Sequence, residues 1–193
     1  MGLFDIIRGH RKPTRPNLDN LFALSTARAT LEVNLALEPM IESGVCFRPA
    51  DMVDFERTVD DLHHLLEVAG RRTSTGFRAH HDDMGFEWVI LRDSDFEEMV
   101  TTSHMVNQTM QEEGYGSQLL CSVFGFHDKD GGAPIYLIYG HKRGTFYPFV
   151  PTGENRRDNT RELRLKTSLD GELPIEPELE RWFPVWGVPL SAD

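Results

Sequence analysis

Residues 116–150, GSQLLCSVFGFHDKDGGAPIYLIYGHKRGTFYPFV, decide the fold class. Two glycine-containing turns, at 128–132 and 140–144, divide this stretch into three apolar segments and predict three adjacent antiparallel strands. In the first segment apolar side chains occupy both sides, with Leu120, Phe124 and Phe126 on one and Leu119, Cys121 and Val123 on the other. Since side chains alternate between the faces of a strand, both faces of the sheet are expected to be covered. Pro148 in the third segment cannot donate a ladder hydrogen bond, which indicates an edge strand.

The segments on either side predict the remaining elements of an α+β fold. Alternation of Leu31, Val33, Leu35 and Leu37 predicts a half-buried strand over 30–37, and a turn over 39–44 leads to a return strand at 45–47. Apolar spacing of three and four residues predicts a helix over 51–69, and residues 77–80 and 86–91 predict a hairpin. Ser94 and Glu97 form a capping-box pattern that opens a helix ending at 113.

A short helix near residue 17 and a charged helix from 158 or 159 to 169 complete the expected order, α-ββ-α-ββ-α-βββ-α. Runs of adjacent strands indicate a mainly antiparallel sheet, here of about seven strands with three to four packing helices. The length of 193 residues suits a single domain. We expect a basic amphipathic arm over 1–16, an α+β domain over 17–171, and a Pro/Trp-rich C-terminal tail over 172–193 that packs on the domain.

The distribution of charge excludes one class of partner and suggests another. The net charge of −11 argues against binding to nucleic acid, because that affinity comes mainly from neutralising phosphates. Residues 1–16 nevertheless carry a net charge of +3, so the remaining 177 residues carry −14. A basic arm on an acidic body suits an anionic membrane surface or an acidic partner.

The apolar residues of the arm are the candidates for membrane contact. Leu3, Phe4, Ile6 and Ile7 would share one side of a short helix, followed by the cations Arg8, Arg11 and Lys12. A helix of this length is marginal alone in water, so docking on the core of the same protein or remaining disordered are the alternatives. The start of the sequence shows no secretory signal pattern, and the expected location is the cytoplasm, with peripheral binding at the inner face of the membrane as a variant.

No combination of residues predicts a catalytic centre, a metal site or a cofactor. His80, His81, Asp82 and Asp83 cluster in one hairpin turn, but adjacent strand residues point to opposite faces, so a polar turn is the preferred interpretation. Cys46 and Cys121 fall within predicted strands without a pairing motif and are expected to be reduced core residues. The residues therefore favour a protein without catalytic activity.

Two aromatic segments are the candidates for partner binding. One contains Arg143, Phe146, Tyr147 and Phe149 in the predicted edge strand, and the other contains Trp182, Phe183 and Trp186 in the tail. Aromatic residues and arginine are enriched at binding hot spots, and an unpaired edge strand can recruit another strand. The alternative is that the tail covers the edge strand, which protects it from aggregation. A homodimer is a further expectation, because both faces of the sheet need cover and the predicted helices are few.

Several motifs together resemble one known family. They are MGLFD at the start, Asn17 to Leu24 (NLDNLFAL), Gly44 to Phe47 (GVCF), Gly116 to Cys121 (GSQLLC), Lys142 to Phe149 (KRGTFYPF) and Arg181 to Gly187 (RWFPVWG). With these the chain resembles the PspA-associated protein family (PspAB) from end to end. The resemblance implies a non-catalytic accessory or interaction protein of a PspA-type, phage-shock envelope-stress system, with a PspA homologue as partner. It implies no catalytic residue. The alternative is an enzyme or small-molecule-binding protein whose pocket has no sequence motif.

Overall fold

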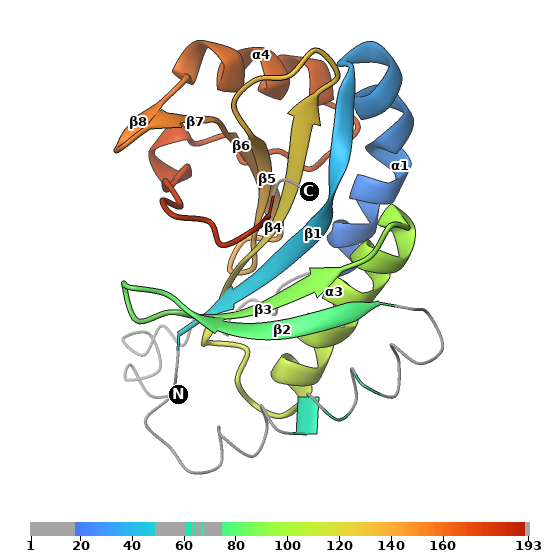
Figure 1. The fold of residues 1–193 in the computed structure, drawn as a ribbon, viewed down its shortest axis with the longest axis vertical. Helices are drawn as coiled ribbons and strands as arrows, with labels where there is room; N and C mark the ends of the chain where they lie inside the picture. Colours follow the sequence, from blue (N-terminus) through green and yellow to red (C-terminus); the bar gives the residue numbers. More distant parts are fainter. Residues whose placement is uncertain (1–17, 49–60, 63, 65–66, 68–74, 192–193) are drawn as a thin grey trace, which may run out of the picture.

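A six-stranded antiparallel sheet with the strand order β2-β3-β1-β4-β5-β6 forms the centre of the molecule (Figure 1). The computed structural model describes residues 18–48, 61, 62, 64, 67 and 75–191. The strands of the sheet are β1 (Leu37–Phe47), β2 (Gly76–His81), β3 (Glu87–Arg92), β4 (Leu119–Asp128), β5 (Ile135–Gly140) and β6 (Thr145–Phe149). A separate small sheet pairs β7 (Pro151–Gly153) with β8 (Arg156–Arg157). The α+β prediction is confirmed.

Helices cover one face of this sheet. They are the 3₁₀ helix η1 (Leu18–Phe22), α1 (Ala23–Ala29), the π-helical turn η2 (Thr30–Asn34), α3 (Phe96–Glu112) and α4 (Asn159–Leu169). Figure 1 shows α1 and α3 along the same side of β1. The helix predicted over 51–69 lies mostly outside the described residues, as does the N-terminal arm. Within the described residues, no helix combines the length and apolar character needed to cross a bilayer.

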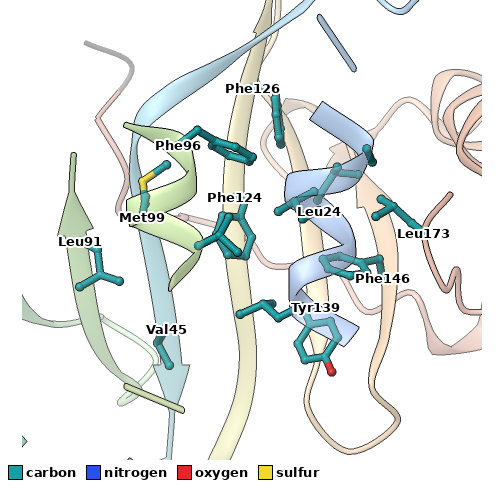
Figure 2. Packing of buried hydrophobic residues seen from close by; sticks show 14 of the residues in the cluster. Leu24, Val45, Leu91, Phe96, Met99, Phe124, Phe126, Tyr139, Phe146 and Leu173 are labelled. Atoms are coloured by element: carbon teal, nitrogen blue, oxygen red, sulfur yellow. The ribbon is translucent and has the colours of Figure 1, made fainter. Parts of the chain in front are cut away.

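The larger hydrophobic cluster lies between the helices and the sheet. Helical spacing places Phe96, Met99 and Val106 on one side of α3, and all three are buried. Phe96 meets the rings of Phe124 and Phe126 on β4 edge to face, with ring centroids 6.2 and 5.7 Å apart. Figure 2 shows Phe124 next to Leu24 of α1, with Leu173, which follows α4, on the other side of α1 in this view. This layer confirms the predicted buried side of the helix that begins near residue 95.

The three-strand core predicted from residues 116–150 is confirmed. The strands β4, β5 and β6 are consecutive neighbours, and β6, which contains Pro148, is an edge strand. A second buried cluster covers the face away from the helices and includes Cys46, Trp88, Val123, Ile138 and Trp182. Both faces of the sheet are therefore buried, as the two-sided apolar pattern predicted.

The strand predicted over 30–37 is wrong. Residues 30–34 are helical and continue α1. In a strand Leu31 and Val33 would lie on the same face, but Leu31 is fully buried whereas Val33 is 78% exposed. Leu24, Ala27 and Leu31 follow one another at spacings of three and four and are all buried. The alternating pattern covers only residues 31–37, whereas the helical pattern already begins at Leu24. The helical pattern determines the structure of residues 30–34.

The turn predicted over 39–44 is also wrong, because β1 continues through it. The register of β1 against β4 shifts between Pro39 and Ser43, opposite Gly125, which is a bulge in β1. Pro39 lies in the part of β1 that pairs with β4 but not with β3, so its missing N–H removes no bond to β3. The side chain of Met40 occupies the space where a Cβ atom on Gly125 would lie. A bulge thus allows a proline within a central strand.

Two smaller expectations need correction. A second register shift, between Cys46 and Phe47, leaves Leu120 without a partner on β1. As a result Leu119 packs in the helix-side cluster and Leu120 against the opposite one, the reverse of simple alternation. The N-cap of α3 is Asp95 rather than Ser94, since the Asp95 side chain accepts hydrogen bonds from the backbone amides of Glu97 and Glu98.

Candidate functional site

The C-terminal tail begins by adding to the edge of the sheet. Phe146 of β6 donates a backbone hydrogen bond to Pro174 and accepts one from Glu176, each 2.8 Å long, and Phe146 and Ile175 form a parallel bridge. This pairing satisfies part of the edge that β6 would otherwise present to another strand. Of the two alternatives for the aromatic edge, the structure shows the tail covering it at this point.

The tail then turns onto the face of the sheet opposite the helices. After the 3₁₀ turn η3 (Leu179–Arg181), the Trp182 ring stacks on Tyr147 with centroids 6.2 Å apart, and its indole N–H donates to the Glu176 carbonyl at 3.0 Å. Trp186 meets the ring of Phe149 edge to face at 5.0 Å. Figure 1 shows this red segment on the opposite side of β4 and β5 from α1. Tyr147 and Phe149 of the edge strand are therefore covered by Trp182 and Trp186 of the tail.

Polar anchors hold the tail along its length. Arg157 donates to the Trp182 carbonyl at 2.7 Å, and the Tyr147 hydroxyl donates to the Phe183 carbonyl at 3.0 Å. Near the end, the amide of Ser191 donates to a Glu42 carboxylate oxygen at 2.7 Å. Burial alone would raise the pKa of Glu42, but this hydrogen bond and the nearby guanidinium of Arg78 outweigh it, so the pKa lies below its ordinary value.

Between the tail and the β2–β3 hairpin the same face of the sheet is hollowed into a groove. Its volume is about 1830 Å³. Cys46, Trp88, Cys121 and Tyr147 form its floor, and we name the whole hollow the tail groove. Met84 and Phe86 of the hairpin lie along one wall, and Phe183, Pro184 and Val185 of the tail lie along the other. The segment 111–119 and the β5–β6 turn line its ends.

The walls of the tail groove carry two exposed apolar side chains. Phe183 is 65% exposed and Met84 is 57% exposed. Large apolar side chains exposed on two walls of one groove are a feature of interaction surfaces rather than of a closed core. The groove therefore provides apolar surface for a further segment of polypeptide or another apolar ligand.

Both positively and negatively charged side chains line the tail groove. Arg143 pairs with Glu176 at 2.6 Å and with Glu178 at 3.4 Å, and Arg181 also pairs with Glu178, at 2.8 Å. Arg48 and Lys142 add two exposed cations to the lining. With Asp82, Glu112 and Glu176 also in the lining, the groove carries four cations against three carboxylates, on a chain whose net charge is −11.

The cluster of histidine and aspartate residues in the β2–β3 turn is structural. The Asp82 carboxylate accepts hydrogen bonds from the amides of Met84 and Phe86 and from the Trp88 indole, at 2.8 to 2.9 Å. Burial opposes these bonds, yet they lower the pKa of Asp82. The polar-turn interpretation agrees with this geometry, and no set of three or more metal-ligating side chains gathers among the described residues.

Cys46 and Cys121 lie directly opposite each other on β1 and β4, on the floor of the tail groove. Both are free, with 4% and 8% of their surface exposed. The hydrogen bond between the two thiols, together with burial, raises the pKa of Cys46. The prediction of buried cysteines without a disulfide agrees with this, but no pattern in the sequence indicated that the two would meet.

A buried polar group beneath β4 offers no exposed nucleophile. Ser122 lies 3.2 Å from the ring of His141 and accepts a hydrogen bond of 3.0 Å from Asn107. Burial lowers the pKa of His141 to about 3, so the ring is neutral at ordinary pH. All three side chains are fully buried, and none of them lines the tail groove. Their arrangement is that of a core hydrogen-bond network between α3 and the sheet.

The structure separates the predicted partner-binding residues into two groups. Phe146 and Phe149 are fully buried, and Tyr147 and Trp182 nearly so, whereas Trp186 is half-buried and Arg143 and Phe183 are exposed. Only Arg143, Tyr147 and Phe183 line the tail groove. The predicted membrane-contact residues, Leu3, Phe4, Ile6, Ile7, Arg8, Arg11 and Lys12, lie outside the described residues.

Sequence reasoning missed the contribution of the β2–β3 hairpin to the groove. Met84 and Phe86 were part of a segment interpreted only as a turn and a strand, although an exposed methionine at a hairpin turn is a signal that was available. The pairing of Cys46 with Cys121 depends on the register of β1 against β4, which contains two shifts. That register could not be derived from the pattern of apolar residues.

The family comparison agrees with the resemblance described above. The model of the family PspA associated protein B matches residues 1–190. No curated protein and no solved structure matches the chain.

Proposed function

The chain belongs to the PspA associated protein B family, and from this premise we propose that it is a non-catalytic accessory protein that binds a PspA homologue in a phage-shock envelope-stress system. The family name supports an association with PspA. The tail groove is the single structural observation that supports binding as the mode of action.

The size of the groove favours a polypeptide segment over a small molecule. Pockets for small ligands are about 300–1,000 Å³, and the tail groove is larger, about 1830 Å³. A groove of this size with apolar walls suits an amphipathic segment whose apolar side chains lie against Met84 and Phe183. In this proposal Arg143 and Lys142 contact polar groups at the edge of the bound segment.

The rival function is an enzyme or a small-molecule-binding protein. A pocket that brought together His104, His127 and Arg143 would favour it. Of these three residues only Arg143 lines the tail groove, while His104 lies against Phe22 and His127 faces Glu38 at 3.6 Å. Among the residues that the structure describes, the polar side chains lining the groove include no histidine to act as a base, and binding is the better-supported proposal.

Co-purification with the PspA homologue from the same cells tests the proposal. We expect the wild-type chain to retain the homologue, with the tag on either protein. Phe183→Asp and Met84→Asp should each weaken binding by at least about tenfold, because a carboxylate in an apolar contact loses its hydration without a partner. Both side chains are exposed, so the free energy of unfolding should change by no more than about 0.5 kcal/mol.

Matched controls place the same charge on apolar surface away from the groove. Val33 and Leu163 are exposed and do not line the groove, so Val33→Asp and Leu163→Asp should leave binding unchanged. Failure of the wild type to bind in either tag orientation would contradict the PspA contact. Full binding by a folded Phe183→Asp, Met84→Asp double variant would show that the contact lies elsewhere. Alanine variants of Phe146 or Trp182 would test folding, because both side chains are buried.

The N-terminal arm supports a second, weaker contact, with the inner face of the membrane from the cytoplasm. Burial of Leu3, Phe4, Ile6 and Ile7 gives a few kcal/mol at about 25 cal/mol per Å², which the ordering of about ten residues largely offsets. Each of the cations Arg8, Arg11 and Lys12 adds about 1 kcal/mol near anionic lipid. We therefore expect weak, salt-sensitive flotation with anionic vesicles and none with neutral ones. Equal flotation by a form lacking residues 1–12 would rule out this role.

A further inference from the structure

We infer that Cys46 and Cys121 form a redox-active dithiol site on the floor of the tail groove, which closes to a disulfide on reaction with a low-molecular-weight disulfide of the carboxylate-bearing thiol class. The site lies in the same groove as the partner contact proposed above but does not depend on that contact. Its basis is the position of the two thiols, the opening above one of them and the charge around that opening.

The positions of the two residues fit a disulfide. Residues directly opposite in an antiparallel pair have Cα atoms about 4.5 or 5.5 Å apart, and both values lie within the range of disulfides. Side chains opposite each other also point to the same face, and both cysteines belong to the cluster on the groove side of the sheet. Cβ atoms of opposite residues lie about 1 Å farther apart than in a relaxed disulfide, so closing the bond strains the two strands. A strained disulfide is easier to reduce. Such bonds are characteristic of reversible, regulatory disulfides.

A glycine leaves one of the thiols accessible. The next residue across the sheet from Cys121, on β5, is Gly140, which also lines the groove. A Cβ atom at Gly140 would lie 3.8 Å from the Thr145 carbonyl oxygen, an ordinary contact distance, so the glycine simply places no side chain beside Cys121. Cys46 has the buried Trp88 as its neighbour on β3 and is 4% exposed, against 8% for Cys121. Cys121 is thus the thiol that an incoming reagent reaches first.

The charges above the floor favour an anionic reagent. Four cations line the groove, Arg48, Lys142, Arg143 and Arg181, against the three carboxylates Asp82, Glu112 and Glu176, and Arg48 and Lys142 are exposed. Exposed cations at the rim of the groove attract a carboxylate-bearing disulfide. The hydrogen bond to Cys121, together with burial, raises the pKa of Cys46, so Cys46 is the thiol that reacts second.

The reaction proceeds in two exchange steps. The Cys121 thiolate attacks one sulfur of the small disulfide, whose other sulfur leaves as a thiolate and takes up the Cys121 proton. The Cys46 sulfur, losing its own proton, then attacks the Cys121 sulfur and expels the second small thiol. Two protein S–H bonds and one small S–S bond are broken, one protein S–S bond forms, and two small thiols are released. The protein is oxidised by two electrons and the small disulfide is reduced by two.

The test uses the full chain, whose only cysteines are these two, so thiol counts report on the site alone. In glutathione buffers of increasing disulfide content, we expect the wild type to lose both thiols together and the mass of two hydrogen atoms, reversibly. The Cys46→Ser variant should instead gain one glutathione. In Cys121→Ser, the covered Cys46 should react at least about tenfold more slowly. Gly140→Val, which fills the opening, should slow the wild-type reaction.

A second measurement needs no cysteine variant. Phenylarsine oxide forms two As–S bonds to paired thiols and releases one water, so the folded wild type should bind one equivalent and lose both free thiols. Retention of both thiols in the folded wild type, at glutathione disulfide levels that oxidise the urea-unfolded chain, would overturn the inference. A stable mixed disulfide that does not close, or disulfide-linked dimers as the only product, would overturn it as well.

Discussion

The two faces of the sheet are covered by different kinds of structure. On one face, α1 and α3 pack with regular apolar spacing and form a continuous cluster from Leu24 to Phe124 (Figure 2). On the other face the cover is a tail without a long helix, anchored at separate points by Arg157, Tyr147 and Glu42. The first face is closed, and the second retains a groove of about 1830 Å³. Regular secondary structure fills a face of a sheet, whereas a non-helical tail covers it only in part and leaves room for binding.

The tail also removes a reason for expecting a dimer. That expectation assumed that the helices alone would leave one face of the sheet uncovered. In the structure Trp182 and its neighbours in the tail bury much of that face within a single chain. On this face, the described part of the chain leaves the tail groove as surface for a partner.

The largest effect is expected on the helix-covered face. Phe124 is fully buried and packs against Phe96, so Phe124→Ala should lower the free energy of unfolding by about 3–5 kcal/mol, since it leaves a cavity in a closed layer. Urea unfolding followed by circular dichroism measures this. A loss smaller than about 1 kcal/mol would show that this face is not the closed layer described above.

A smaller effect is expected from the corresponding change on the tail-covered face. Trp182 is buried as well, but the tail can detach without unfolding the sheet, so Trp182→Ala should reduce global stability by only about 2 kcal/mol. Hydrogen exchange should show the difference directly, with faster exchange in residues 179–191 and little change in α3. If α3 and the tail lost protection equally, the two faces would form one cooperative unit.

The smallest effect concerns the carboxylate that holds the end of the tail. Since the pKa of Glu42 is lowered in the folded state, its contribution is present above the ordinary glutamate pKa, about 4.3, and is lost as the pH falls through the folded value. Acidification below this range should therefore release the Ser191 end of the tail before it affects the helices. Limited proteolysis with an acid-active protease measures the release.

The matched variant is Glu42→Gln. It should weaken the tail by about 1 kcal/mol at neutral pH, a modest value because the partners Arg78 and Arg92 are partly exposed. It should also remove the acid-dependent step. If the pH dependence persisted in this variant, another group would be responsible.

The sequence identified the elements whose apolar pattern is long and regular. The meander over 116–150, the hairpin before residue 92 and the buried side of α3 were all predicted, because each has enough periodic positions to specify one face. The helical character of 30–34 was missed, because four alternating residues, Leu31 to Leu37, matched a strand within a shorter window. The bulge at Pro39 was missed because proline is more often found at a turn.

By itself the sequence determined an antiparallel α+β sheet with apolar residues on both faces, an acidic body with a basic arm, and membership of its family. The tertiary structure alone decided which aromatic residues remain exposed, where the groove lies, and that Cys46 and Cys121 meet. The physical reason is that periodicity reports how a segment is buried, while the identity of its cover and its register depend on long-range packing. Two bulges in the pairing of β1 with β4, and a tail that returns to the face opposite the helices, set those contacts, and neither leaves a periodic signal in the sequence.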